Sequence, residues 1–192
     1  MIQEPAFEAN SKAMKQIHMI MMIVLLIMNT LILVPLLRAP YPKFAGALYN
    51  VINCLALVFG IVYLRKGYSK NSATYYKLFL LLVAASNLAL IGTMFTYAGL
   101  QGIRLTIAAG AIIIKIILIL ALAFAKDLGR RNSRIIFCVL LTVELIYGFL
   151  FAPRGFLPVS IIVLVLSRLI MTGVIGLAIK GKYEDKASRG AS

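Results

Sequence analysis

The chain has 192 residues, of which 62% are hydrophobic, and it carries a formal net charge of +14. A soluble domain is about 45–50% apolar, so no soluble fold of this size could hide so much apolar surface from water. The basic residues lie mostly in short loops beside apolar stretches, which favours anionic lipid headgroups over nucleic acid as their partners.

Six long apolar segments follow one another along the chain. Each is close to the roughly 20 residues that an α-helix needs to cross a bilayer, and none alternates as a membrane β-strand would. We therefore predict an all-α polytopic membrane protein with a single transmembrane domain over residues 1–192. The predicted spans are Ile17–Leu37, Phe44–Leu64, Leu78–Tyr97, Ile103–Ala125, Ile135–Ala152 and Pro158–Ile179.

The loops between these spans differ in charge. One side carries fourteen basic residues: Lys12, Lys15, Arg65, Lys66, Lys70, Lys77, Lys126, Arg130, Arg131, Arg134, Lys180, Lys182, Lys186 and Arg189. The other side carries four: Arg38, Lys43, Arg104 and Arg154. Because cytoplasmic loops carry the excess of Lys and Arg, we predict that both termini are cytoplasmic, in a plasma or inner cell membrane.

The loops on the less basic side contain residues that reverse the chain. They include Ala39-Pro40-Tyr41-Pro42, Gly99-Leu100-Gln101-Gly102 and Pro153-Arg154-Gly155. Proline and glycine at such points end one helix and allow the next to return. The sequence therefore predicts three antiparallel helical hairpins.

The three hairpins resemble one another, with repeats at approximately 16–72, 73–133 and 134–188. The odd-numbered spans carry Asn29, Asn87 and Glu144, which are 58 (87 − 29) and 57 (144 − 87) residues apart. The even-numbered spans carry Asn53, Lys115 and Arg168, each 11 or 12 residues before a basic loop. This pattern predicts a pseudo-threefold repeat about an axis along the membrane normal, although any protein built of three hairpins shares some of it.

Lys115, Glu144 and Arg168 lie near the middle of their spans. They are 10 to 12 residues from the basic loops, which corresponds to about 15–18 Å of helix, close to the midplane of a hydrocarbon core about 30 Å thick. A lone charge at that depth costs about 2.5–3.5 kcal/mol on insertion scales. These side chains should therefore face the bundle interior and pair with one another.

Two interpretations of the three charges remain open. In the structural one, Glu144 pairs with Arg168 or Lys115, the asparagines bond between helices, and the network only fixes helix packing. In the functional one, the surplus positive charge is relieved by an anionic ligand, a lipid phosphate or a change in the protonation of Lys115.

The sequence gives little support for catalysis. It has one histidine, His18, and two cysteines, Cys54 and Cys138, both within apolar spans. A zinc site needs three or four clustered ligands, and a nucleophile needs a neighbouring base. We therefore predict no enzyme activity, no metal and no cofactor.

The leading prediction is a small transporter or permease component that binds an anionic or zwitterionic molecule, or a lipid headgroup, near the bilayer midplane. The predicted ligand-binding residues are Lys115, Glu144, Arg168, Asn29, Asn53 and Asn87. The alternative is a non-catalytic scaffold, sensor or effector subunit. Expected partners are anionic lipids at the cytoplasmic loops and a second copy or another membrane subunit, but not nucleic acid.

Overall fold

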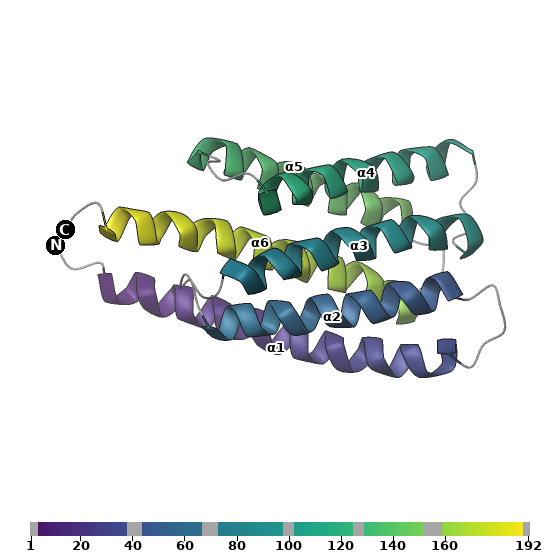
Figure 1. Ribbon diagram of the computed structural model, residues 1–192, viewed down its shortest axis with the longest axis horizontal. Helices are drawn as coiled ribbons and strands as arrows, with labels where there is room; N and C mark the ends of the chain where they lie inside the picture. Colours follow the sequence, from purple (N-terminus) through teal and green to yellow (C-terminus); the bar gives the residue numbers. More distant parts are fainter. Residues whose placement is uncertain are drawn as a thin grey trace.

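The protein is a bundle of α-helices (Figure 1). The computed structural model describes residues 4–37, 44–66, 73–97, 102–124, 129–151 and 159–189. These form six helices: α1 (Glu4–Leu37), α2 (Phe44–Lys66), α3 (Ala73–Tyr97), α4 (Ile103–Phe124), α5 (Arg130–Phe151) and α6 (Val159–Arg189). The described ranges contain no strand, so the predicted all-α class is confirmed.

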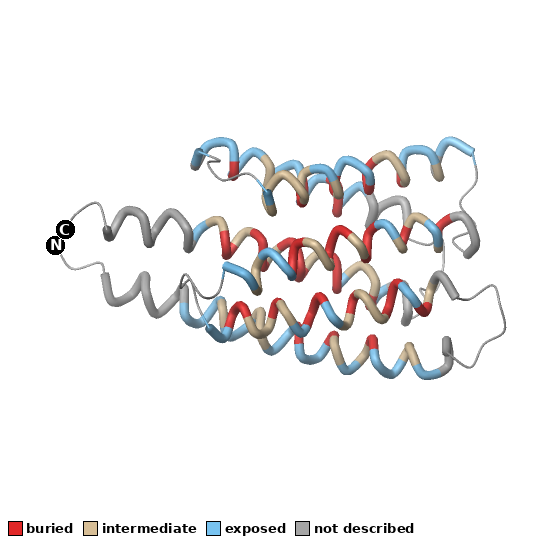
Figure 2. Tube along the Cα trace, in the orientation of Figure 1, coloured by how far each residue is buried: buried red, intermediate tan, exposed pale blue. Residues whose placement is uncertain are grey.

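Five of the helices are long and apolar enough to cross a membrane. They provide the candidate spans Lys12–Val34, Gly46–Lys66, Ala73–Met94, Leu105–Phe124 and Ile162–Lys180. In α5 the described side chains include Arg131, Arg134 and Glu144 and stop at residue 146, so the predicted span Ile135–Ala152 stays a prediction. Many large apolar side chains, such as Ile20, Leu31 and Ile117, are exposed, as expected where lipid is the solvent. Figure 2 marks the exposed residues in pale blue along the helices.

Two helices extend well beyond their predicted spans. Helix α1 begins at Glu4, before the apolar segment, and α6 continues past Ile179 to Arg189. These extensions contain Ala, Glu and Lys, which favour helices but do not favour lipid, so hydropathy alone did not detect them. They place the start of α1 and the end of α6 at the same end of the bundle (Figure 1).

Several sequence predictions lie outside the described residues. Arg38, Lys43, Lys70, Lys126 and Arg154 do so, as do the turns at 39–42 and 153–155. The same holds for the side chains of Arg104, Arg130, Lys182, Lys186 and Arg189. Of the predicted Gly99–Gly102 turn, Gly102 is described: its φ of 56° is a conformation that glycine adopts without strain, and its carbonyl accepts from Thr106 N at 3.2 Å as α4 begins.

The helices form a closed ring in chain order. Each packs against the next, α6 packs against both α5 and α1, and α2 also reaches α6 across the ring. Neighbours along the chain run antiparallel (Figure 1). Helix α6 therefore contacts helices from both the first and the last hairpin.

Glycines let α6 approach its two neighbours closely. A Cβ atom on Gly176 would lie 2.7 Å from Cε2 of Phe137 on α5, and one on Gly173 would lie 2.7 Å from Nε2 of His18 on α1. Because Cβ atoms do not approach other heavy atoms this closely, a larger residue at either position would force the Phe137 or His18 ring to shift. The contacts fix α6 between α1 and α5.

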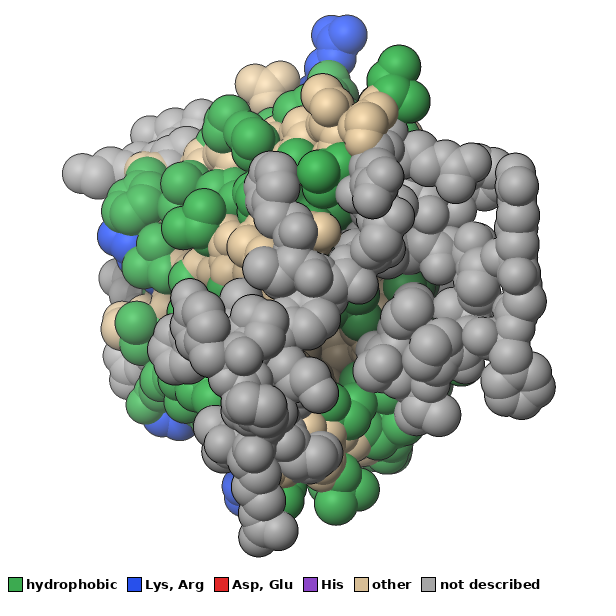
Figure 3. Space-filling model, turned by 90° about the vertical axis from the view of Figure 1, so that its right-hand side faces the viewer, with side chains coloured by type: hydrophobic (Ala, Val, Ile, Leu, Met, Phe, Trp, Pro, Cys, Tyr) green, Lys and Arg blue, Asp and Glu red, His purple; other side chains and the backbone are tan. Residues whose placement is uncertain are grey.

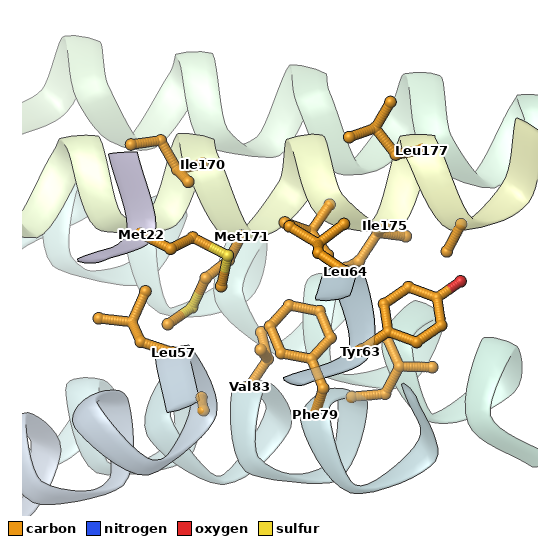
Figure 4. Packing of buried hydrophobic residues seen from close by; sticks show 14 of the residues in the cluster. Met22, Leu57, Tyr63, Leu64, Phe79, Val83, Ile170, Met171, Ile175 and Leu177 are labelled. Atoms are coloured by element: carbon orange, nitrogen blue, oxygen red, sulfur yellow. The ribbon is translucent and has the colours of Figure 1, made fainter. Parts of the chain in front are cut away.

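Two apolar clusters fill the interior. The larger joins residues from all six helices around Phe79, Leu57 and Ile175, with Met22 and Met171 beside them (Figure 4). The smaller contains Tyr49, Leu90, Met94, Ala108 and Ile112 from α2, α3 and α4. The view onto the bundle end opposite the start of α1 shows mostly hydrophobic described side chains, with Lys and Arg at the edges (Figure 3).

Candidate binding site in the buried polar layer

A layer of buried polar side chains separates the two apolar clusters along α2, α3 and α4. On α3, for example, Val83 and Ala84 belong to the larger cluster, Leu90 belongs to the smaller one, and Asn87 lies between them. Every helix contributes one predicted site residue to this layer: Asn29, Asn53, Asn87, Lys115, Glu144 and Arg168. None is more than 3% exposed, so the predicted inward orientation of these residues is observed.

Three ionisable side chains of the layer form one cluster, which we call the charged triad: Lys115, Glu144 and Arg168. Lys115 Nζ donates to Glu144 Oε1, and Arg168 Nε lies 2.9 Å from Glu144 Oε2. The hydroxyl of Thr172, one turn along α6 from Arg168, donates to Glu144 Oε1 at 3.3 Å. The triad thus joins α4, α5 and α6 through a single carboxylate.

The charges in the triad do not balance. Two cationic side chains share one carboxylate, which gives a formal sum of +1 at a place where the three residues are only 1–3% exposed. Charges interact far more strongly at low dielectric than in water, and an uncompensated charge there is costly. A balanced charge therefore requires either a further negative charge or the loss of a proton from Lys115.

A second, neutral network lies on the other side of the layer. Asn53 Nδ2 donates to Asn29 Oδ1 at 3.1 Å, and Asn29 Nδ2 donates to Ser167 Oγ at 3.1 Å and to the Leu25 carbonyl at 2.8 Å. We call Asn29, Asn53 and Ser167 the amide network. It joins α1, α2 and α6 as the triad joins α4, α5 and α6.

Helix α6 carries residues of both networks. Ser167 and Arg168 are consecutive, and a rotation of about 100° per residue turns their side chains toward different neighbours. Ser167 bonds toward α1, and Arg168 bonds toward α5. Neither Ser167 nor Thr172 was among the predicted ligand-binding residues. A hydroxyl next to a buried polar residue was the signal that could have identified both.

Asn87 stands apart from both networks. Its Nδ2 donates to the Val83 carbonyl of its own helix at 2.6 Å. Its Oδ1 is buried and has no hydrogen-bond partner within the described part of the chain. The six predicted residues therefore do not form one continuous hydrogen-bonded site.

Asn87 and Lys115 occupy corresponding places on α3 and α4. Leu90 of α3 and Ile112 of α4 belong to the same buried cluster. Asn87 comes three residues before Leu90 and Lys115 three residues after Ile112, so on each helix the polar residue lies between the smaller and the larger cluster. Lys115 nonetheless bonds to Glu144, on the opposite side of α4.

The comparisons with known proteins give no further guidance. No protein-family model, no curated protein and no solved structure matches this chain. Among the described residues, no three His, Cys, Asp or Glu side chains come together as a metal site. The polar layer contains two cations, one carboxylate, amides and hydroxyls, which are groups that bind ligands through hydrogen bonds and ion pairs without covalent change.

Proposed function

We propose that this chain is a non-enzymatic membrane transporter or permease component that binds an anionic or zwitterionic molecule, or a lipid headgroup, in the polar layer. The observation that carries the proposal is the surplus positive charge of the triad, buried between α4, α5 and α6. Ionisable residues inside a membrane bundle commonly mark a substrate pathway.

Packing stability alone is a weak reason to bury such a triad. Replacing buried ion pairs by apolar residues of similar volume is often neutral or stabilising. The amide network already joins three helices without any charge. A role in binding accounts for the two cations, whereas a role in packing does not require both.

In the proposed mechanism, Glu144 is an internal counter-ion that holds the two cations when no ligand is bound. An arriving anion competes with the Glu144 carboxylate for Lys115 and Arg168. Because Glu144 lies on α5 and the cations lie on α4 and α6, this exchange loosens the contacts among three helices. A change in helix packing coupled to ligand binding is what transport requires.

The proposal includes a threefold repeat of hairpins. Asn29 and Asn53, which are 24 residues apart, bond between α1 and α2. Glu144 and Arg168, also 24 residues apart (168 − 144), bond between α5 and α6. Matched pairs in the first and third hairpins support the repeat, and the middle hairpin departs from it because Lys115 bonds to Glu144 and not to Asn87.

The proposed orientation places both termini in the cytoplasm. Exposed basic residues at the end of the bundle where α1 begins support it, including Arg65 and Lys66 of α2 and Lys77 of α3. Lys66 Nζ donates to the Tyr75 hydroxyl at 3.1 Å and lies 4.4 Å from the centre of that ring. Tyrosine and lysine side by side are typical of a membrane interface, where they contact anionic headgroups.

A second candidate function is a non-catalytic scaffold, sensor or effector subunit, alone or with a second copy or another membrane subunit. This second function is favoured by the contacts within the triad, because both Glu144 carboxylate oxygens already have partners in the protein and all three side chains are buried. In that case the triad would only fix the positions of α4, α5 and α6.

Mass spectrometry of molecules that co-purify in mild detergent separates the two candidates. We expect a small anion or an anionic lipid to co-purify with the wild-type protein and to be lost in Lys115→Met. That variant keeps the balanced Glu144–Arg168 pair and should remain folded. Lys12→Met, which removes an exposed lysine of α1 far from the triad, should retain the anion.

The two arms of this experiment have different consequences. Detection of a lipid or of a soluble anion would identify the source of the bound negative charge. If the wild-type protein and Lys115→Met carry the same molecules in the same amounts, the transporter proposal is wrong. Loss of folded protein in Lys115→Met together with the absence of any bound anion in the wild type would favour the scaffold.

A further inference from the structure

The charged triad also indicates which ion accompanies the ligand, an inference that rests on the proposed function. Without a bound anion, the formal charge of +1 is removed only if one of the three groups changes its protonation. Arg168 keeps its charge, because a guanidinium does not lose its proton in proteins. Protonation of Glu144 would raise the formal sum to +2. Only the loss of a proton from Lys115 brings the sum to zero.

The contacts of Glu144 do not require a charge on Lys115. Arg168 Nε lies 2.9 Å from Glu144 Oε2, and the Thr172 hydroxyl donates to Oε1 at 3.3 Å. The carboxylate and the guanidinium therefore form a neutral pair by themselves. An amine donates to a carboxylate oxygen as an ammonium does, so the contact between Lys115 and Glu144 is compatible with either form of the lysine.

The surroundings of Lys115 offer few partners to an ammonium. The residue is 1% exposed, and Glu144 Oε1 is the one acceptor that its Nζ reaches among the described residues. An ammonium has three N–H donors and an amine has two, so the charged form buries one more donor without an acceptor. Buried donors that lack acceptors are unfavourable, and more so when they are charged.

The neighbouring helices bring no further charge to Lys115 among the side chains that the structure describes. Helix α4 packs against α3 and α5. The residue of α3 in the polar layer is Asn87, which has no titratable proton, and the Cys138 thiol of α5 is exposed. The other charged residues described on α3, α5 and α6 lie at least 10 residues from the layer (87 − 77, 144 − 134), or about 15 Å: Lys77, Arg131, Arg134 and Lys180. The protonation of Lys115 therefore depends on Glu144, Arg168 and the ligand.

We propose that Lys115 is a neutral amine when no ligand is bound and takes up one proton as the anion binds, so that the proton is the coupling ion. The amine nitrogen accepts the proton, and the resulting ammonium pairs with the anion; no other bond changes. Of the two cations for which the anion competes, it takes Lys115, because Glu144 would otherwise lose its counter-ion Arg168. The layer is then neutral both before and after binding, and the chain carries an anion and a proton together.

NMR of the full chain labelled with ¹⁵N-lysine tests the first half of the proposal. The protein is placed in nanodiscs of phosphatidylcholine, which supply no net anion, at about pH 7.5, where an ordinary lysine is charged. The Nζ shift of Lys115, identified by its absence in Lys115→Met, should be that of an amine. Exposed Lys12 provides the ammonium reference in the same sample. An ammonium signal from Lys115 in the wild-type protein would overturn the proposal.

Arg168→Met tests the charge count itself. Without the guanidinium, Lys115 is the remaining counter-ion of Glu144, so its Nζ signal should be that of an ammonium even without an anion. Arg131→Met is the matched control, since it removes an exposed arginine of α5 and should leave Lys115 an amine. An amine signal in folded Arg168→Met would contradict the proposal. If this variant does not fold, the wild-type measurement still decides.

Added anions test the coupling. Sodium acetate is the soluble probe, and phosphatidylglycerol mixed into the nanodiscs is a lipid probe with one negative charge. Either should change the Lys115 signal from amine to ammonium. Because binding and protonation are linked, the affinity for acetate should fall about tenfold for each unit by which the pH rises. Histidine ordinarily changes charge between about pH 5 and 8, so His18→Gln is the control and should keep this dependence.

The failures of the two proposals are distinguishable. If acetate or phosphatidylglycerol binds while Lys115 remains an amine, or if the affinity for acetate does not change with pH, the proton inference is wrong and the proposed function stands. If neither probe binds and no anion co-purifies with the wild-type protein, both are wrong.

Discussion

The two sides of α6 solve the same packing problem with different chemistry. Toward α1 and α2, Ser167 joins a network of neutral amides in which Asn53 donates to Asn29 and Asn29 donates to Ser167. Toward α4 and α5, Arg168 joins a cluster of ionised groups that carries one cation more than it needs. Neutral groups hold one half of the bundle together, so packing alone does not require the excess formal charge of the other half.

Glu144→Gln is the most severe test of this difference. It leaves two buried cations without their carboxylate, so we expect a loss of about 3–5 kcal/mol in the free energy of unfolding, as for other buried pairs that lose one partner. Unfolding in mixed detergent micelles measures the loss. Acetate added to the buffer should restore part of the stability, since it can replace the missing carboxylate. Equal stability with and without acetate would count against anion binding.

Removal of a single cation should have a smaller effect. Lys115→Met and Arg168→Met each leave one balanced pair with Glu144, so the expected loss is that of one charged hydrogen bond, about 1.5–3 kcal/mol. Acetate should not stabilise either variant, because neither has surplus charge. A loss as large as that of Glu144→Gln would show that the charge balance does not determine stability. Both variants are compared in the same unfolding assay.

The helix contacts on the two sides of α6 can be tested separately. Gly176→Ala places a methyl group against the Phe137 ring on the charged side, and Gly173→Ala places one against His18 on the neutral side. Overpacking of this kind costs about 1–2 kcal/mol. Only Gly176→Ala should also weaken anion binding, because it moves α5, and with it Glu144, away from α6. Gly46→Ala, where a Cβ would meet nothing within 4 Å, is the control.

The smallest expected effect is in the amide network. A double-mutant cycle of Asn29→Leu and Asn53→Leu should give a coupling energy of about 0.6 kcal/mol, the average for hydrogen bonds between membrane helices. Anion binding should be unchanged in both variants if the two sides of α6 are distinct in function. The same cycle for Glu144 and Arg168 should give a larger coupling energy. If the Asn29–Asn53 coupling energy is the larger of the two, the amide network contributes more to helix packing than the triad does.

The sequence was enough to predict the depth of each polar residue along its helix, but not the neighbouring helix that each residue contacts. Counting residues from the basic loops gave the depth of Lys115, Glu144 and Arg168, and burial energetics gave their inward orientation. The partner of each residue was not predictable in the same way. In a helix that is apolar on nearly every side, hydropathy does not indicate which face contacts which neighbouring helix. The structure was therefore needed to show that Lys115 bonds to Glu144 and not to Asn87.

The adjacency of Ser167 and Arg168 has a mechanical consequence. Two consecutive residues of one helix cannot turn independently, so any force that twists α6 at Arg168 is felt at Ser167 in the same instant. A rotation of α6 at its α5 face would therefore also move the Ser167 hydroxyl that accepts from Asn29. Asn29 in turn accepts from Asn53, so a single peptide bond of α6 connects its contacts with α5 to the pair α1–α2.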